Sequence, residues 1–479
     1  MSKVGIIKDG NLTYDCIAPF DPLINYPEYP FEQLAEKNPV YDAVRTLFHQ
    51  MGMDIRNFGS PSWNPLGEVI KPGNTVLLKP NMVRHYNPVG DLDCVITHGS
   101  VVRAVLDYVY IALKGRGQII IGDAPLQDCD FERVASHTGL DKIVDFYSQH
   151  GKLQVQLMDL RLVGSCKHIT GLISRKRLDG DLSGYVAVDL KEESELFEII
   201  DDFEKFRVAN YDKEEMVAHH NRQKNEYLIS KSVLQADVII DLPKLKTHSK
   251  AGITCSLKNF VGINGQKDWL AHQRIGSLEE GGDEYLHKSI RKRLETKLVE
   301  NIDVATSKLW AMLLKLSCLM IVGTGKIFPH KTPYREGGWY GNDTVPRTIA
   351  DLNRIALYAD KNGILQETVQ RRILVVVDAI VAGEKQGPLD PSPKHCGLLV
   401  AGRDPVAVDI VCSAIMGFDY LKIPQFKYAL KEKKCRILQE NLEDIEFAPS
   451  KCKNIHDVYT IYGDNFEPSK GWAGHIERE

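Results

Sequence analysis

The spacing of apolar residues along this chain predicts strands and helices in alternation. Short apolar runs of strand length lie at 3–7, 75–78 and 236–242, and a run with helical periodicity lies at 97–115. Strand, helix and strand in succession, with polar residues where the strands end, are typical of a parallel α/β sheet. We therefore expect an α/β fold in which a mostly parallel sheet is flanked by helices.

Local signals set the ends of several elements. Thr97 or Ser100 is expected to cap the helix at 97–115, and the Asp404–Pro405 pair is typical of a helix start. The stretch AIVAGEKQGPLDPSPKHCGLLVAGRDPVAVD is expected to be a Gly- and Pro-rich loop, bracketed by a strand and a helix, that forms a lid or wall of an active site. We expect further strands at 118–121, 153–160 and 371–383, and helices at 41–51, 131–147, 287–330, 344–358 and 403–417.

A chain of 479 residues is too long for one ordinary core, so several structural parts are expected. Between 163 and 235 the sequence changes to short strands, acidic runs and polar turns, which indicates an inserted α+β region. The expected parts are an N-terminal extension at 1–70, a first α/β part at 71–162, the inserted region at 163–235, a second α/β part at 236–417 and a mixed C-terminal cap at 418–479.

Charge and cysteine content argue against nucleic-acid binding and against zinc or iron–sulfur sites. With 60 basic and 64 acidic residues the net charge is −4, which provides no general attraction to nucleic acid, and we expect no nucleic-acid partner. No two of the ten cysteines form CxxC, so neither a zinc site nor an iron–sulfur cluster is expected. The first residues, MSKVGIIKDG, indicate a strand rather than a signal peptide, and we expect a cytoplasmic protein. The oligomeric state stays open.

One long apolar stretch needs its own explanation. Residues 309–322, LWAMLLKLSCLMIV, are too few to span a bilayer, and Lys315 interrupts them. Attachment to a membrane is the less favoured alternative. We expect a buried helix and no membrane span.

Polar residues follow four of the predicted strands. Lys79 and Asn81 follow the first, Asp123 the second, Lys244, Lys246 and His248 the third, and Asp378 and Glu384 the fourth. In an open α/β sheet, ligands bind beyond the carboxyl ends of the strands. Lysines and amides suit an anionic ligand such as a carboxylate or a phosphate. We therefore expect the four strand ends to share a cleft in which Lys79, Asn81, Asp123 and Lys244 bind substrate. The alternative is that Lys79 and Lys244 are solvated loop lysines.

The segment 246–287 has the highest density of titratable groups, interspersed with glycines. Lys258 has apolar neighbours in TCSLKNFVG, and burial lowers the pKa of a lysine until it can act as a nucleophile or base. His248 suits proton transfer because the ordinary pKa of histidine lies near neutrality. Lys246, Lys258 and His248 are thus the candidate catalytic residues. The alternative is a lysine that reaches solvent and a histidine that caps or hydrogen-bonds.

The same segment offers further ligands. His248 and His272 are candidate metal ligands, although no carboxylate stands at a fixed spacing from them. Asn259 and Arg274 are candidate substrate-binding residues. No metal is identified by this pattern, and a divalent ion is one possibility among several.

A third cluster lies in REGGWYGNDTVPRTIADLNR, which covers 335–354. Trp339, between glycines, is suited to stacking on a sugar or another flat ligand, as is its neighbour Tyr340. Asn342, Asp343 and Arg347 supply polar groups for recognition. The simpler alternative for Asp343 is that, with Asn342, it caps the following helix.

Five stretches of this chain resemble the family called domain of unknown function 362. They are VLLKPNMV, THGSVVRAVLDY, IIIGDAP, DVIIDLPKLKTHSKAGITCSLKNFVGI and DAIVAGEKQGPLDPSPKHCGLLVAGRDPVAVD, between about residues 72 and 417. Some members of that family carry a ferredoxin-like module with iron–sulfur clusters. The resemblance therefore implies, as one alternative, a partner of an iron–sulfur redox protein, against which the scattered cysteines argue.

A partial resemblance concerns mechanism. The order His248, Lys258, His272 in a Gly-rich segment after a strand is similar to lactate racemase. That resemblance implies a nickel-pincer nucleotide held by Lys258, nickel ligated by His272 and proton transfer by His248. The surroundings differ, because SLKNFVG replaces a glycine-rich run and the Asp-Arg-Pro-Thr-Pro-type motif is absent from the sequence.

The sequence thus leads to two main hypotheses. The first is an enzyme that acts on an anionic, hydroxyl-bearing small molecule, such as a hydroxy acid or sugar acid, by proton or hydride transfer; this makes it an epimerase, a racemase or an oxidoreductase, with or without a metal. The second is a non-catalytic binding protein for a phosphorylated or carboxylated ligand. The density of titratable groups beside glycines favours the enzyme.

Overall fold

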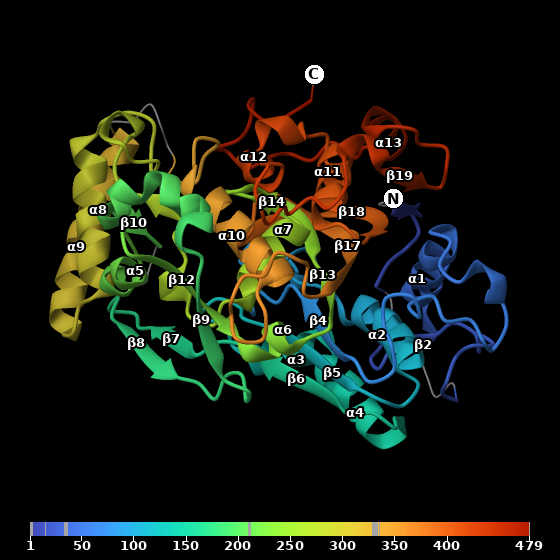
Figure 1. Cartoon of the computed structure of the whole chain (residues 1–479). Helices are drawn as coiled ribbons and strands as arrows, with labels where there is room; N and C mark the ends of the chain where they lie inside the picture. The colour runs from blue at the N-terminus through green and yellow to red at the C-terminus, as the bar shows by residue number, and fades with distance from the viewer. Residues whose placement is uncertain are drawn as a thin grey trace.

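One large sheet organises the molecule. The computed structural model describes residues 3–14, 16–32, 37–208, 212–327, 334 and 336–478 (Figure 1), and within them the large sheet has ten strands. The hairpin of β14 (Lys244–His248) and β15 (Gly252–Thr254) joins it through β17. The other eight strands are, in spatial order, β19 (Glu446–Ala448), β1 (Lys3–Lys8), β18 (Asp390–Gly402), β17 (Arg372–Gln386), β13 (Val238–Leu242), β4 (Thr75–Pro80), β5 (Gln118–Asp123) and β6 (Val155–Asp159).

The central part of this sheet is parallel. β17, β13, β4, β5 and β6 all run in the same direction. β18 is antiparallel to β17 and to β1, and β19 pairs with β1 in parallel. The predicted α/β fold with a mostly parallel sheet is therefore confirmed.

Helices cover both faces of the sheet (Figure 1). Side chains alternate along β4, so that Val76 and Leu78 enter the core formed with α1 and α2, while Leu77 enters the core formed with α10 and α11. The α-helices are α1 (Pro39–Gln50), α2 (Gly99–Leu113), α3 (Phe131–Thr138), α4 (Leu140–His150), α5 (Lys213–His219), α6 (Lys231–Gln235), α7 (Ser256–Asn259), α8 (Ile290–Asp303), α9 (Lys308–Ile327), α10 (Thr344–Tyr358), α11 (Pro405–Ile415), α12 (Pro424–Ala429) and α13 (Ile455–Tyr462).

The segment between β6 and β13 builds small sheets beside the large one (Figure 1, green). β7 and β8 form a hairpin, β12 pairs with β9 and β11, and β10 pairs with β16. The bounds of the remaining strands are β2 (Asp21–Pro22), β3 (Lys37–Asn38), β7 (Val163–Lys167), β8 (Ile173–Arg177), β9 (Tyr185–Asp189), β10 (Phe206–Arg207), β11 (His220–Asn221), β12 (Lys224–Ser230) and β16 (Gln273–Arg274).

Two helix boundaries differ from the prediction. The expected helix at 131–147 is two helices, α3 and α4, because Gly139 between them has φ +71°, a conformation that ends a helix. The cap of α2 is neither Thr97 nor Ser100. It is His98, whose side chain accepts from the backbone N–H of Ser100.

The expected Gly- and Pro-rich lid is part of a long hairpin. β17 and β18 pair as far as Gln386 and Asp390, with one shift of register between Ala379 and Val381, so most of this stretch is strand rather than loop. Pro391 and Pro393 are compatible with a strand here, because β18 pairs with β1 only from Leu398 onward and its outer edge is open at the prolines.

The prediction of a buried helix at 309–322 is wrong. α9 covers this stretch and places Leu309, Leu316 and Met320 at the surface, with exposed fractions of 64%, 49% and 68%. The part of the predicted helical region at 328–330 lies outside the described residues. Among the described helices, none has the length and apolar character needed to cross a bilayer.

Candidate functional site

A buried ion pair joins the ends of two neighbouring strands. Lys79 at the end of β4 lies 2.7 Å from Asp123 at the end of β5, measured from Nζ to Oδ1. The second carboxylate oxygen of Asp123 accepts from the backbone N–H of Met82 at 2.8 Å. The backbone of Gly262 lies against the pair, and a Cβ there would come within 1.9 Å of Asp123 Oδ1. Glycine at this position allows the segment after α7 to close over the pair.

Two asparagines extend the pair into a network. Asn259 Oδ1 accepts from Lys79 Nζ at 3.3 Å and from Asn81 Nδ2 at 2.9 Å. The Oδ1 atom of Asn81 in turn accepts from Lys246 Nζ at 2.7 Å. The structure thus brings together Lys79, Asn81, Asp123 and Lys246, four of the residues expected at the strand ends, with Asn259, a candidate from the segment that follows.

Two buried carboxyl groups hold α7 in place beneath this network. Asp241 accepts from Asn259 Nδ2 at 2.7 Å and from Ser256 Oγ at 2.6 Å. Asp409 of α11 accepts from the backbone N–H groups of Ser256 and Leu257, at 2.8 and 3.0 Å. Burial raises the pKa of each carboxyl to about 7, against the lowering effect of Lys79 on Asp241 and of hydrogen bonds on Asp409.

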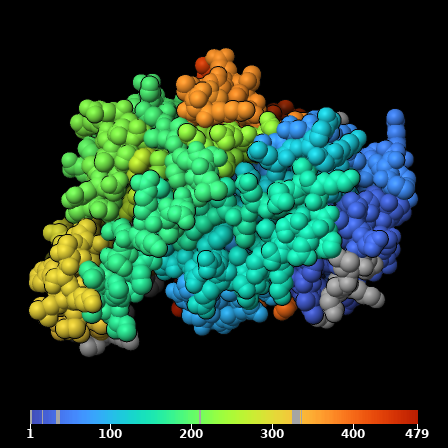
Figure 2. All heavy atoms as spheres, turned by 90° about the horizontal axis from the view of Figure 1, so that it is seen from below, coloured from blue at the N-terminus to red at the C-terminus, as the bar shows by residue number. Residues whose placement is uncertain are grey.

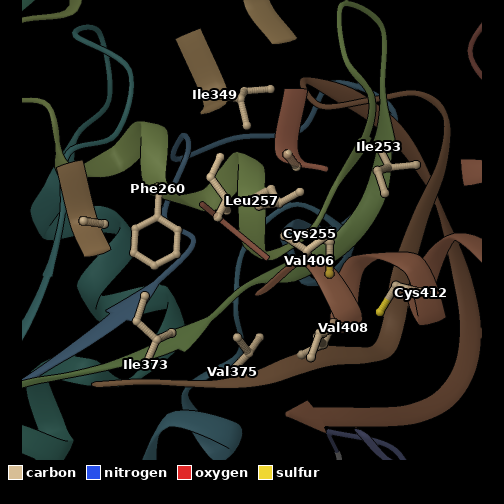
Figure 3. Packing of buried hydrophobic residues seen from close by; sticks show 14 of the residues in the cluster. Ile253, Cys255, Leu257, Phe260, Ile349, Ile373, Val375, Val406, Val408 and Cys412 are labelled. Carbon is tan, nitrogen blue, oxygen red and sulfur yellow. The ribbon is translucent and has the colours of Figure 1, made fainter. Parts of the chain in front are cut away.

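Apolar packing fixes the same helix. Figure 3 shows Leu257 and Phe260, which flank Lys258 and Asn259, among side chains of β17 and α11 such as Val375 and Val406. Both flanking residues are almost fully buried. Because they anchor α7 on both sides, the positions of Lys258 and Asn259 are set by the core.

Several lysines lie close together in this region, and burial and mutual repulsion destabilise their protonated forms. Burial, followed by the charge of Lys244, lowers the pKa of Lys246 to about 7. Burial, followed by the charges of Lys250 and Lys79, lowers the pKa of Lys258 to about 8. Burial lowers the pKa of Lys267 to about 7, against the opposing effect of Asp123. An anion placed among these groups would offset their repulsion.

Lys258 differs from its neighbours in its contacts. In the described part of the chain its Nζ makes no hydrogen bond and no ion pair, although the side chain is only partly exposed. Lys250 Nζ, by contrast, donates to Gln273 Oε1 at 2.8 Å, and Lys267 Nζ donates to the carbonyl of Val261 at 3.2 Å. Thr254, directly opposite Lys246 on the β14–β15 hairpin, has a buried hydroxyl without a partner. Both groups are available to a ligand.

His248 and His272 are held in opposite tautomers. His248 Nδ1 accepts from the backbone N–H groups of Lys250 and Ala251, both at 3.1 Å, so the proton of the neutral ring lies on Nε2. His272 Nδ1 lies 2.7 Å from the carbonyl of Leu270 and donates to it, which leaves Nε2 as an acceptor. Burial and then the charge of Lys258 lower both pKa values well below the ordinary one, so both rings are neutral at pH 7.

Lys244 has different partners from its neighbours on β14. Its Nζ lies 2.7 Å from Asp378 Oδ2 and donates to the hydroxyl of Tyr14 at 2.8 Å. Lys244 and Asp378 are fully buried, so this lysine is neutralised within the protein. Alternation along the strand places Lys244 and Lys246 on one side, but their side chains reach different partners.

The predicted polar cluster at 342–347 is linked within the protein. Arg274 lies 3.8 Å from Asp283 and 3.9 Å from Asp343. Asp343 also pairs with Arg347 at 2.9 Å. The cap of α10 is supplied by Asn342, whose Oδ1 accepts from Thr344 and Val345, rather than by the side chain of Asp343.

The two aromatic residues of this cluster are packed against the protein. Trp339 is fully buried and its indole N–H donates to the carbonyl of Asp283 at 2.9 Å. Tyr340 stacks on His475, with ring centroids 3.6 Å apart. Trp339, expected to stack on a sugar or another flat ligand, packs as a core residue instead.

Metal ligation by His248 and His272 lacks a third donor in the described residues. Within them, a group of three His, Cys, Asp or Glu ligand atoms lying within 4.8 Å of one another occurs only at Asp91, Asp93 and His137, at the surface. His248 Nδ1 is also occupied by two backbone donors. His272 Nε2 is the one available imidazole acceptor of the pair, and a metal at this site stays a prediction.

Four residues of the site were not among the candidate site residues assigned from the sequence: Asp241, Lys250, Thr254 and Lys267. Asp241 interrupts the apolar run VIIDL, and a carboxylate inside a buried strand was a signal for a supporting role. The other three lie in the segment 244–272, where spacing gives no indication of which side chains converge.

Comparison with known proteins gives a family and distant relatives. The family described as domain of unknown function (DUF362) matches residues 76–161 and 163–414. A thylakoid-associated protein of Synechocystis sp. is 23% identical over 393 residues, which cover 82% of this chain and 74% of that protein. A crystal structure of a Thermotoga maritima protein is similar over 76% of this chain, at 10% identity and a TM-score of 0.30, and this chain spans 56% of its length. None of these matches connects the chain to lactate racemase.

Proposed function

Because the chain belongs to the DUF362 family, whose description names no activity, we propose a function from the site itself. The protein is an enzyme that binds a small hydroxy acid or sugar acid through its carboxylate and moves a proton at the carbinol carbon. The observation that carries this proposal is Lys258, a lysine with lowered pKa and no partner in the described chain, beside two neutral histidines of opposite tautomer.

The lysines account for the anionic part of the substrate. Lys246 and Lys258 carry positive charge at a cost, and a bound carboxylate would stabilise their protonated forms. The hydroxyl of Thr254, which lacks a partner, adds a hydrogen bond to the same ligand. Asn81 and Asn259 fix the position of Lys246 and do not need to touch the substrate.

The histidines and Lys258 account for the chemistry. His272 Nε2 is an acceptor and takes the proton from the carbinol carbon, while the carbonyl of Leu270 stabilises the imidazolium through Nδ1–H. The electron pair left on carbon is delocalised into the carboxylate, which the lysines hold. The Lys258 ammonium, whose pKa is about 8, returns a proton to that carbon, while His248 Nε2–H donates a hydrogen bond and keeps its proton. The neutral lysine and the His272 imidazolium then return to their starting states by proton exchange with solvent. Proton loss and gain balance, and return on the opposite face inverts the centre, as in a racemase or epimerase.

Exchange of substrate hydrogen with solvent tests this proposal directly. The protein is incubated in D2O with a panel of 2-hydroxy acids and sugar acids, and proton NMR follows the signal of the carbinol C–H. We expect loss of that signal for at least one acid, and its persistence after His272→Asn. The exposed His456→Asn is the matched control and should exchange at the wild-type rate.

Binding is measured separately from turnover. Isothermal titration calorimetry with the acid that exchanges should show that Lys258→Met weakens binding by tenfold or more, about the effect of one lost charge-assisted hydrogen bond. Lys152→Met, at an exposed position, should bind as wild type does. If no acid of the panel exchanges, the proton-transfer proposal is wrong.

The second candidate function is a binding protein for a carboxylated or phosphorylated ligand. The same unpaired Lys258 favours it, and it differs in predicting Lys258-dependent binding without exchange in any of the acids. A nickel-pincer cofactor on Lys258 is distinguished from both by intact mass, which would exceed that of the unmodified chain. In this proposal the enzyme works in the cytoplasm. Because the Synechocystis relative is thylakoid-associated, cell fractionation should compare the amount of the protein in the cytoplasmic and membrane fractions.

A further inference from the structure

Helix α9 is apolar on two opposite sides. Ala311 and Leu314 are buried against the rest of the protein, and α8 packs along the helix. At 100° per residue, a second apolar stripe lies within about 120° on the other side of the helix. It consists of exposed residues: Leu309, Met312, Leu313, Leu316, Leu319 and Met320, whose exposed fractions range from 40% to 68%.

This stripe lies at the rim of the molecule. Figure 1 shows α8 and α9 side by side at the left edge, and Figure 2 shows the same yellow segment at the edge after a turn of 90°. Trp310, 55% exposed, lies at the first turn of α9 beside the stripe. In water this much contiguous apolar surface on one helix is unfavourable, and a surface of this kind marks an interaction site.

The charges around the stripe indicate what it interacts with. On α8 and α9, the exposed charged side chains of the described residues are basic: Arg293, Lys297 and Lys308. Arg293 pairs with Glu280, so Lys297 and Lys308 supply the positive charge beside the stripe. The acidic residues of α8 are partly or fully buried, and Glu300 pairs with Arg207 at 2.5 Å. Positive charge beside an apolar helix face is the pattern of helices that lie in the surface of an anionic bilayer.

The hairpin β7–β8 continues this surface. Lys315 Nζ donates to the carbonyl of Ile169 at 2.7 Å, which ties the tip of the hairpin to α9. Ile169 itself is 94% exposed. Lys176 and Arg177 on β8 are exposed and add positive charge along the hairpin, whereas Arg175 lies 3.8 Å from Asp268.

We propose that α9 attaches the protein to the surface of a membrane containing anionic lipids. The helix lies in the plane of the interface, with the stripe from Leu309 to Met320 among the acyl chains, Trp310 at the headgroup level and the lysines on phosphates. The face is a single exposed helix rather than a groove, which suits a fluid surface better than a rigid partner. This proposal is independent of the one for the lysine site.

Sedimentation with vesicles tests it on the full chain. Vesicles of phosphatidylcholine mixed with phosphatidylglycerol are compared with vesicles of phosphatidylcholine alone. We expect binding to the mixed vesicles, weakened at high salt, and at least tenfold weaker binding to the neutral ones, the effect of losing two or three lysine contacts. Equal binding to both compositions, or binding to neither, would overturn the proposal.

A charge-insertion variant locates the surface. L313E/L316E/M320E should bind the mixed vesicles at least tenfold more weakly, because three apolar side chains can no longer enter the acyl region. L182E/L421E, changed at exposed leucines of other elements, is the control and should bind as wild type does. Circular dichroism and the thermal midpoint show that each variant is folded. Wild-type binding by the α9 variant would overturn the proposal.

A second copy of the chain is the competing occupant. Light scattering coupled to size-exclusion chromatography measures the mass of the protein across a range of concentrations. We expect a mass that does not depend on the α9 substitutions. A dimer that becomes a monomer in L313E/L316E/M320E would overturn membrane attachment and assign the stripe to self-association.

Discussion

Lys79 and Asp123 form an ion pair of 2.7 Å with side-chain exposures of 0% and 4%, closed over by the backbone of Gly262. A charge at such depth is stable only with its partner and further hydrogen bonds, which Asn259 and the N–H of Met82 supply. Lys79 of this pair hydrogen-bonds to Asn259, and Asn259 is the neighbour of Lys258 on α7. The pair therefore helps to fix the position of the more exposed Lys258.

Removing one member of this pair should be strongly destabilising. Asp123→Asn leaves the Lys79 ammonium buried without a counter-charge, and we expect a loss of about 3–5 kcal/mol in the free energy of unfolding, measured with urea. Lys79→Met with Asp123→Leu should recover most of that loss, because no charge stays unpaired. Arg403→Met, at the exposed pair with Glu68, should change stability by less than about 0.5 kcal/mol.

Gly262→Ala should disturb the Lys79–Asp123 ion pair by a steric clash. The new Cβ would lie 1.9 Å from Asp123 Oδ1 and 2.6 Å from Lys79 Nζ, so the pair or the backbone must move. We expect a loss of about 1–3 kcal/mol in unfolding free energy together with weaker ligand binding. Gly10→Ala, where nothing lies within 4 Å of the new atom, is the matched control and should be close to neutral. A neutral Gly262→Ala would contradict the closed geometry.

Anion binding should take up protons. The pKa of Lys246 is about 7 and that of Lys258 about 8, so both lysines lose protons as the pH of the free protein rises through this range. An anion favours the protonated lysines, and its affinity should fall between pH 7 and 9. Calorimetric titrations in two buffers of different ionisation enthalpy measure the uptake at pH 8, and a value of zero would contradict the lysine site.

Lys267→Met should alter the dependence of stability on pH. In the native state the pKa of Lys267 is about 7, well below its value in the unfolded chain, so the unfolded state binds more protons above pH 7. This lysine therefore makes stability rise with pH from about 7 to about 10. The substitution removes that rise, by about 2 kcal/mol between pH 7 and 9. Urea unfolding at pH 6, 7 and 9 measures it, and Lys152→Met should leave the wild-type slope.

Asn342 should prove to be both a cap and a link to the histidine. Asn342→Ala removes the acceptor for the first N–H groups of α10 and the donor to the carbonyl of His272, and we expect a loss of about 2 kcal/mol. Asn342→Asp keeps the cap but loses the donor, so its loss should be smaller. Thermal unfolding of both variants checks the order, and equal losses would show that the cap does not contribute.

How far sequence reasoning reaches is clearest at β4, β5 and β13. Parallel neighbours bring their carboxyl ends together, so Lys79, Asn81 and Asp123 were predictable as a group from three apolar runs alone. Lys244 was not separable from Lys246, because alternation fixes the side of a strand and not the partner that a long side chain reaches. The buried phenol and carboxylate that neutralise Lys244 come from positions 14 and 378, far away in sequence.

Helix α9 is an element whose burial the sequence predicted wrongly. A helix with apolar residues on all sides is ordinarily a buried one, and the prediction of burial followed that rule. The sequence shows that the outer stripe of α9 is apolar, but it does not show that no element of the described chain covers this stripe. Likewise, the prolines of β18 indicated a loop, because sequence alone does not show that this part of the strand lies at an open edge.

The position of β13 between β4 and β17 has a consequence for how the protein is made. During synthesis β4, β5 and β6 emerge within the first 160 residues, whereas the strand that covers the other edge of β4 begins only at Val238. Until then the ribosome holds a half-sheet whose β4 edge is unpaired and open to misassociation. Lys79 and Asp123 both belong to that half-sheet and can pair before β13 is made. The lysine-rich hairpin β14–β15 and α7 then pack against strand ends whose two charges already neutralise each other.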